Sequence, residues 1–197
     1  MKNLITNYWT SDGKPILERV DLYRYQELSE RFRELYGVEL PSQFKLHRMG
    51  LKSDELYVLH NDYEVRFQYR GENYRFKMLK GFIFDKASVP QFLRSIVDND
   101  DPDVMISAMC HDAMFALHLV PFRRANKLFY WIIKTVMLTK VEQISDKRER
   151  RKLKRETRYK PKLYFLGVAT PIGRKIYNSC NPFDHWLQNF VIFSKGN

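Results

Sequence analysis

The sequence predicts an α+β domain, in which a small antiparallel β-sheet packs against a helical hairpin and additional helices lie at the N- and C-termini. Strand-forming runs separated by short turns occupy residues 55–84, and helical periodicity dominates residues 102–138. The chain has 197 residues, of which 44% are hydrophobic and 15% aromatic, so it can build one sizeable core. We predict a core domain at 51–178, an N-terminal helical extension at 1–50 and a C-terminal amphipathic helix at 179–197.

The N-terminal extension is predicted to contain an amphipathic helix over residues 16–36. Its apolar residues recur at helical spacing from Leu22 to Leu35, and the following Gly37 is a stop signal. Pro41 then begins an irregular connection to the sheet.

Three strand-forming runs follow, at 56–60, 63–69 and 74–78. Short turns at 61–62 and 71–73 separate them, which favours antiparallel pairing of neighbouring runs. A further short strand is expected at 81–84, where the chain leaves the sheet.

Two helices after the strands form the predicted hairpin. Asp101-Pro102 is a helix start, and the first helix runs from there to about Leu119. After Pro121, apolar residues recur at i, i+3, i+4, i+7, i+8 and i+11 and define a second helix over 122–138.

The remaining helices are predicted from weaker signals. Pro90 suits the first turn of a short helix at 90–97. A charged helix is expected at 141–160, because Pro161 interrupts the helical pattern there. An apolar stripe from Phe183 to Val191 indicates the C-terminal helix.

Composition points to a soluble protein of a reducing compartment. Cys110 and Cys180 are the only cysteines, too few for a disulfide framework. The N-terminus lacks the apolar core of a signal peptide, and no apolar run approaches the ~18 residues of a transmembrane helix. We therefore expect neither secretion by a signal peptide nor membrane insertion.

The net charge of +11 is concentrated in one segment. Residues 147–162 contain ten basic and two acidic residues, so this segment carries +8 and the rest of the chain only +3. The segment could bind the phosphates of DNA or RNA, meet an acidic partner, or form a solvated helix face. Its few aromatic side chains give little support to stacking on single-stranded bases.

The apolar stripe near the C-terminus favours docking on the chain's own core. Its terminal position also keeps docking on a partner open, in the manner of a helix in a groove. Together with the basic segment it supplies the candidate interaction residues, which are Lys147, Arg148, Arg150, Arg151, Lys152, Lys154, Arg155, Arg158, Phe183, Trp186, Leu187 and Phe190.

Asp112 is the chemical anomaly of the sequence, because it falls on the apolar face of a core helix. A carboxylate in that position is costly unless it is paired or hydrogen-bonded. Arg123 and Arg124, at the start of the next helix, and a bound cation are its candidate partners. His111 lies about 100° around the helix from it.

Two interpretations of this polar group remain open. Asp85 and Ser88 lie where the chain leaves the sheet, a frequent place for functional groups. In a hydrolytic site, a divalent metal would be held by Asp85, His111 and Asp112, and the catalytic residues would be His111, Asp112, Asp85 and Ser88. In a buried hydrogen-bond network, in which Asp112 pairs with Arg124, the members would be Asp85, Ser88, Asp112, Arg123, Arg124 and Asn126.

The chain resembles the phage- and prophage-associated "domain of unknown function 1353" family in three segments. That family shows the patterns GF.TD.ASVP, HD.LY and R..AD..F in this order. The corresponding segments here are Gly81-Phe-Ile-Phe-Asp-Lys-Ala-Ser-Val-Pro90, Cys110-His-Asp-Ala-Met-Phe115 and Arg123-Arg-Ala-Asn-Lys-Leu-Phe129. The close resemblance covers residues 75–138, and a looser one extends to 178.

Two departures from the family pattern bear on its chemistry. Asn126 stands where the family has the aspartate of R..AD. Phe115 stands where the family has the tyrosine of HD.LY, and Ala113 after the His-Asp pair likewise supplies no phenol. If the family cluster were a metal or acid–base site, this chain would lack one carboxylate and the phenolic hydroxyls.

The resemblance implies a viral or prophage origin and a shared polar cluster, and it carries no established activity. We expect a bacteriophage virion structural or assembly protein of tail, neck or baseplate type, without chemistry of its own or a cofactor, that binds other phage proteins. The alternatives are a metal-assisted hydrolase of a cell-wall, lipid-ester or nucleotide substrate, and a counter-defence binding protein. We expect it in the host cytoplasm, in a virion, or in both.

Overall fold

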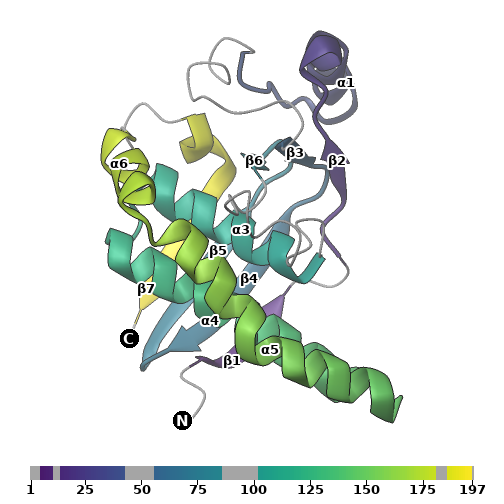
Figure 1. The fold of residues 1–197 in the computed structure, drawn as a ribbon. Coiled ribbons are helices and arrows are strands. Elements are labelled where there is room, and N and C mark those ends of the chain that lie inside the picture. The colour runs from purple at the N-terminus through teal and green to yellow at the C-terminus, as the bar shows by residue number, and fades with distance from the viewer. Residues whose placement is uncertain (1–4, 11–13, 43–55, 86–101, 181–185, 197) are drawn as a thin grey trace.

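The chain forms an α+β fold in which helices cover one face of an antiparallel sheet. The computed structural model describes residues 5–10, 14–42, 56–85, 102–180 and 186–196. In Figure 1, the helices α3 and α4 lie against a long sheet and α5 packs alongside α4. A second, smaller sheet lies at one end of the first, next to α1. The predicted α+β class, with a sheet packed on a helical hairpin, is therefore confirmed.

The larger sheet has four strands in the order β1-β4-β5-β7, all antiparallel to their neighbours. The strands are β1 (Ile5–Thr10), β4 (Tyr63–Tyr69), β5 (Glu72–Met78) and β7 (Val191–Gly196). Strands β4 and β5 form a hairpin with positive φ values at both Arg70 (55°) and Gly71 (85°). This backbone shape matches a two-residue hairpin turn. The turn therefore lies at 70–71, one residue earlier than the sequence predicted.

The smaller sheet has the order β2-β3-β6 and is also antiparallel. It contains β2 (Leu17–Arg19), β3 (Leu56–Leu59) and β6 (Ile83–Asp85). The predicted helix over 16–36 was therefore wrong at its start, because residues 17–19 satisfy their backbone groups by pairing with β3.

Helical structure begins only after Asp21, whose side chain accepts the backbone N–H of Tyr23. A short 3₁₀ helix, η1 (Leu22–Arg24), leads into α1 (Tyr25–Tyr36). The predicted stop at Gly37 is confirmed by its left-handed conformation and its N–H bond to the Arg33 carbonyl.

The helical hairpin predicted after residue 102 is confirmed. Its two helices are α3 (Pro102–Ala116) and α4 (Phe122–Gln143), and they pack on each other. They are followed by α5 (Lys147–Val168) and α6 (Pro171–Ser179). No helix in the described residues combines the length and the apolar character that crossing a bilayer requires.

Pro161 does not end the charged helix, contrary to the prediction. It lies inside α5, where Pro161, Tyr164 and Val168 are buried on one side of the helix. Proline in a helix interior costs about 3 kcal/mol or more in isolation. Burial of apolar surface against the core offsets that cost, which local sequence patterns do not reveal.

The predicted C-terminal amphipathic helix, 179–197, was also wrong. The described part of this segment contains a 3₁₀ helix, η3 (Trp186–Phe190), and then strand β7. Strand β7 pairs with β5 from Met78↔Val191 to Asn73↔Gly196, and the ring of Phe193 packs 4.9 Å from that of Phe76. The segment therefore completes the sheet, as β1 does at the opposite edge, so neither terminal extension is only helical. Phe183 lies outside the described residues.

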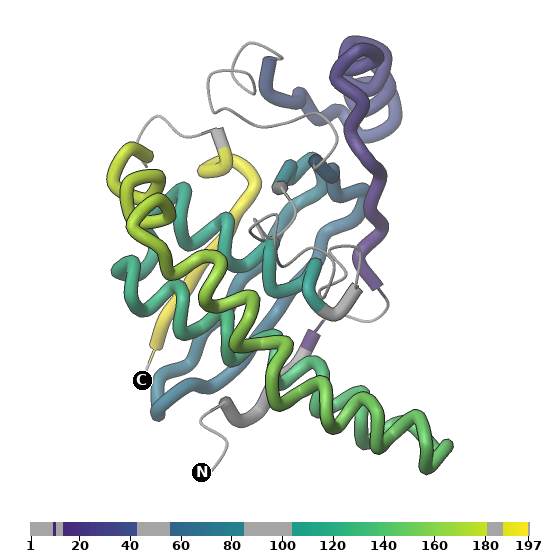
Figure 2. The backbone as a smooth tube through the Cα atoms, in the orientation of Figure 1, coloured from purple at the N-terminus to yellow at the C-terminus, as the bar shows by residue number. Residues whose placement is uncertain are grey.

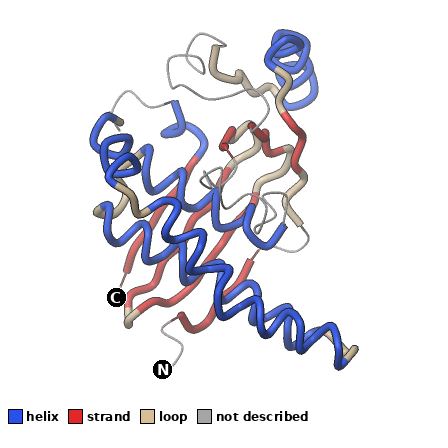
Figure 3. The backbone as a smooth tube through the Cα atoms, viewed as in Figure 1, coloured by secondary structure: helices blue, strands red, loops and turns tan. Residues whose placement is uncertain are grey.

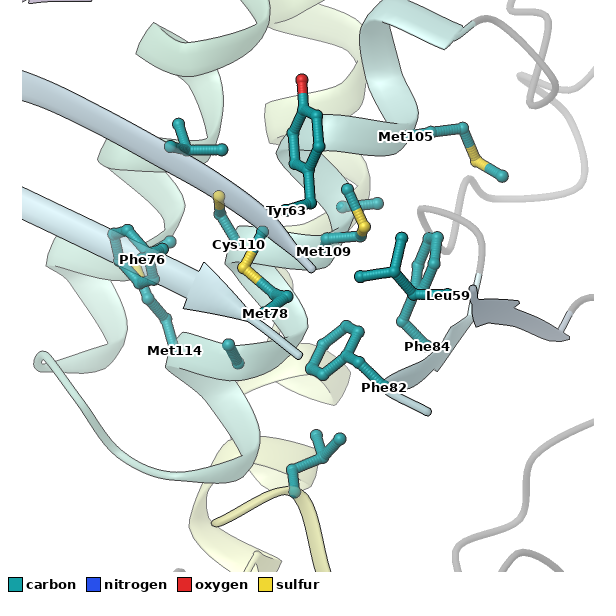
Figure 4. Close-up of a cluster of buried hydrophobic side chains, with 14 of the residues drawn as sticks. Leu59, Tyr63, Phe76, Met78, Phe82, Phe84, Met105, Met109, Cys110 and Met114 are labelled. Carbon is teal, nitrogen blue, oxygen red and sulfur yellow. The ribbon is translucent and has the colours of Figure 1, made fainter. Parts of the chain in front are cut away.

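One continuous core joins both sheets to the helices. Figure 4 shows side chains of α3, including Met109, Cys110 and Met114, beside Phe76 and Met78 of β5. The tube views in Figures 2 and 3 show the same layer of helices crossing the sheet. The packing places the middle of α3, and His111 next to Cys110, deep in the protein.

On the opposite, solvent-facing side of the large sheet, Glu64 binds two arginines. Arg75 donates Nε–H to Oε1 at 2.9 Å and Nη2–H to Oε2 at 3.0 Å, and Arg66 also donates to Oε1. The hydrogen bond from Arg75 is the largest influence and lowers the pKa of the Glu64 carboxyl. Burial opposes this shift, but Arg66 lowers the pKa further, and the two arginines together outweigh burial.

Glu64→Gln should lower Tm at pH 7 by a few degrees. A carboxyl whose pKa is lowered in the folded state stabilises the fold above its unfolded pKa, near 4.5, and loses this effect as pH falls through the folded pKa. The difference between the two proteins should therefore vanish in acid, which thermal unfolding as a function of pH would measure. Glu34→Gln, at an exposed position, is the matched control and should show no such difference. A difference in Tm between the two proteins that stays the same in acid would contradict the stabilising role of the Glu64 carboxylate.

Candidate functional site

The structure brings His111 and Asn126 together between α3 and α4. His111 Nε2–H donates a hydrogen bond of 2.9 Å to Asn126 Oδ1, and the two residues are 6% and 2% exposed. The imidazole also packs against the rings of Phe115 and Phe129, at centroid distances of 4.1 and 4.7 Å. This contact links the two helices of the hairpin inside the core. The hydrogen bond joins the segment 110–115 on α3 to the segment 123–129 on α4.

Asn126 is not fully satisfied by this contact. Its amide nitrogen Nδ2 is buried and has no hydrogen-bond partner among the described residues, and the same holds for Ser107 Oγ. A buried unpaired amide group carries a desolvation cost of about 1–3 kcal/mol. An aspartate, as in the family pattern, would have no such donor to satisfy.

Asp112 is less buried than its neighbour and is not paired with Arg124. Its side chain is 21% exposed, and Oδ1 lies 3.8 Å from His111 Nδ1, too far for a hydrogen bond. The predicted Asp112–Arg124 pair was wrong, because Arg124 turns to the sheet instead. Asp112 also contributes, after burial, to raising the pKa of the Cys180 thiol.

Arg124 ties α4 to strand β5. Its guanidinium donates to Glu72 Oε2 and to the Tyr74 hydroxyl, the latter at 2.7 Å from Nη2 and 3.1 Å from Nε. It also lies 4.6 Å from the centre of the Tyr69 ring. Arg123, the other predicted partner of Asp112, is exposed. Arg124, one of the two arginines in the segment 123–129, therefore holds α4 on the sheet.

The remaining residues of the predicted cluster are only partly described. Asp85 ends strand β6, paired with Leu56, but its side chain and all of Ser88 lie outside the described residues, as does the predicted helix at 90–97. Among the described residues, no three His, Cys, Asp or Glu side chains form a group that could hold a metal ion. The metal set of Asp85, His111 and Asp112 therefore stays a prediction.

Cys110 has the surroundings of a structural thiol. It is completely buried, and this burial raises the pKa of the thiol far above its ordinary value. A thiolate nucleophile at this position is therefore disfavoured.

A second polar cluster, which the sequence did not reveal, joins α1 to the smaller sheet. Arg31 Nη2 contacts both carboxylate oxygens of Glu18, at 2.5 and 2.6 Å, and His60 Nε2–H donates to Glu18 Oε2 at 2.7 Å. The Tyr36 hydroxyl donates to His60 Nδ1 at 3.1 Å. Burial raises the pKa of Glu18, but hydrogen bonds from Arg31 and His60 outweigh it and lower the pKa overall.

In this cluster a phenol, an imidazole and a carboxylate are hydrogen-bonded in a chain. The chain joins α1 to the smaller sheet. His60 also packs against Phe32, with ring centroids 4.6 Å apart. Its members come from positions far apart in the sequence, without regular spacing, so only the three-dimensional structure brings them together.

The fold and the polar contacts described above define an α+β protein in which His111 and Asn126 are buried between α3 and α4, and Arg124 joins α4 to β5. Residues 62–145 match the family model described as "Protein of unknown function (DUF1353)". The matched range runs from the start of β4 to the end of α4 and supports the family resemblance. No curated protein and no solved structure matches the chain significantly.

Proposed function

We propose that this chain is a bacteriophage virion structural or assembly protein that binds other phage proteins and has no chemistry of its own. One observation supports the proposal most: among the described residues of the family segments, His111, Asn126 and Arg124 hold elements of the fold together. His111 and Asn126 bond to each other in the core, and Arg124 bonds to Glu72 and Tyr74 of β5. A catalytic set would instead direct such groups toward a space that a substrate can enter.

The surface offers places for partner proteins. Helix α6 exposes Ile172 and Ile176, which are 72% and 54% exposed and lie one turn apart on the same face. Neighbouring exposed apolar side chains of this kind are typical of protein interaction sites. The phage setting is the expectation that accompanies the family resemblance, and it gives the partner class as other proteins of the particle or of its assembly intermediates.

The first test is incorporation into phage particles. Tagged protein should be found by mass spectrometry in particles, or in assembly intermediates, purified from the phage-producing host. Ile172→Asp combined with Ile176→Asp should greatly reduce incorporation while leaving the circular dichroism spectrum and Tm unchanged. Lys175→Asp combined with Asn178→Asp, exposed on the same helix, is the control. Absence of the wild-type protein from every particle fraction would reject the proposal, and synthesis only early in infection would favour a counter-defence role.

A second test separates this proposal from the metal-assisted hydrolase. We expect the purified protein to contain no stoichiometric divalent ion by elemental analysis. One ion per chain that is lost in Asp112→Asn would overturn the proposal and make His111 and Asp112 parts of a metal site. Asp146→Asn, which changes an exposed acidic N-cap residue of α5, is the control for the loss of one carboxylate.

A further inference from the structure

Helices α4 and α5 form an arm that extends beyond the rest of the protein. Figures 1 and 2 show the end of α4 and the start of α5 running together past the edge of the sheet. We define the basic arm as residues 147–158 of α5, a segment about 18 Å long at the rise of an α-helix. Eight of its residues are Lys or Arg and two are Glu.

The basic residues of the arm face away from α4. Thr157 is buried and Leu153 is half-buried against the core, which fixes the side of α5 that packs on its neighbours. At 3.6 residues per turn, the basic residues cover an arc of about 200° on the other side. All eight are exposed.

Most of these cations are not neutralised within the chain. Glu156 pairs with Lys160, beyond the arm, at 2.8 Å. Arg150 is used locally, donating Nε–H to the Ile144 carbonyl at 2.9 Å. None of the arm's eight basic residues forms an ion pair with any part of the chain that is described. The arm therefore carries an excess of positive charge, which suits it to bind a negatively charged ligand.

We propose that the basic arm binds double-stranded DNA through its phosphates, without reading the base sequence. Duplex DNA carries one negative charge per about 1.7 Å of its axis, so it complements this density of cations. A flat acidic surface would meet only one side of the helix. The walls of a groove, by contrast, can contact an arc as wide as about 200°, and the B-form major groove, about 12 Å wide, admits an α-helix.

The composition and the helical form of the arm favour duplex DNA over duplex RNA and over single strands. The major groove of duplex RNA is too narrow for a helix. Single strands are usually held by stacking on aromatic rings, and the arm contains none, with Tyr159 just beyond it only 40% exposed. The arm also lacks Asn and Gln, the side chains that pair with adenine edges, and its dense cations match the charge of the phosphate backbone. This inference does not depend on the proposed role in a virion.

The test is a titration of the full-length protein against a labelled mixed-sequence DNA duplex, followed by fluorescence anisotropy. A variant with Arg151, Lys152, Lys154 and Arg155 all changed to Gln should bind at least about 100-fold more weakly at low salt. The slope of log K against log salt should become shallower by about 3–4, close to one unit for each lost phosphate contact. Duplexes of unrelated sequence should bind equally well.

A matched variant controls for net charge. It changes Arg19, Arg33, Arg174 and Lys175, which are exposed outside the arm, to Gln and so removes the same charge. Wild-type affinity in this control supports the proposal, provided that both variants keep the wild-type Tm. Equal losses in the two variants, or no duplex binding by the wild type at 50 mM salt, would overturn it. Equal or tighter binding of polyglutamate, single-stranded DNA or duplex RNA would overturn it in favour of those partners.

Discussion

Replacement of Gly81 by alanine should lower the free energy of unfolding by about 2–4 kcal/mol. Gly81 has a φ of +89°, a conformation that strains any residue with a side chain. A Cβ atom there would also lie 2.6 Å from Cε1 of Phe190 and 2.8 Å from Cγ1 of Val38. Phe190 belongs to the core and Val38 packs against it, so neither side chain can move aside without disturbing this packing.

Gly71→Ala is the matched control for this substitution. Gly71 also has a positive φ, +85°, but no atom lies within 4 Å of the position its Cβ would take. We expect about 1 kcal/mol of destabilisation there, from backbone strain alone. Urea unfolding of both variants measures the difference, which isolates the packing part of the effect at Gly81. Equal losses in the two variants would show that the close approach of Phe190 carries no cost.

This geometry gives a physical reason for the glycine that opens the first family segment. Its backbone N–H donates to the Leu59 carbonyl at 2.7 Å and anchors the chain between the two sheets. Space and backbone conformation both demand glycine at this point. The residue therefore needs no catalytic explanation.

The elements that the sequence predicted well are those built from local signals. The β4–β5 hairpin has strand formers on both sides of a tight turn, and α4 has an unbroken helical stripe from Ala125 to Val136. Each pattern spans neighbouring residues, so each can be read without knowledge of the rest of the fold.

The elements that were missed depend on partners far away in the sequence. Strand β7 completes the sheet by pairing with β5, but of the apolar stripe that indicated a helix only Val191 lies in this strand. Pro161 stays within α5 because the core holds that helix in place. Local periodicity carries no information about the edge of β5 or about the core surface under α5. These distant contacts decided that β7 is a strand and that α5 continues through Pro161.

Only part of the candidate site could be predicted, because the sequence shows local spacing but not contacts between distant residues. His111 and Asn126 stood out in the sequence, and their hydrogen bond joins two helices that were themselves predicted. The partner of Asp112 was wrong because Arg124 can reach either helix α3 or strand β5, and the acceptors on β5 decide between them. The cluster of Glu18 and His60 was missed because it has no spacing to detect.

Removal of the His111 side chain should lower the free energy of unfolding by about 3 kcal/mol. His111→Ala would leave a cavity between the rings of Phe115 and Phe129 and would remove the donor to Asn126 Oδ1. Asn126→Ala should cost less, about 1–2 kcal/mol, because it also removes the unpaired Nδ2 group. Chemical denaturation of the purified variants gives both values.

The double variant decides whether His111 and Asn126 act together. Two side chains that share a buried hydrogen bond should show a coupling of about 1 kcal/mol, so that the double variant is less destabilised than the sum of the singles. Such coupling would mean that His111 and Asn126 act together to fasten α3 to α4. Loss of less than about 0.5 kcal/mol in His111→Ala would contradict this role, because removal of a surface side chain typically costs no more. The imidazole would then be dispensable for the fold, and a catalytic or metal-binding role would be needed to explain a histidine in the core.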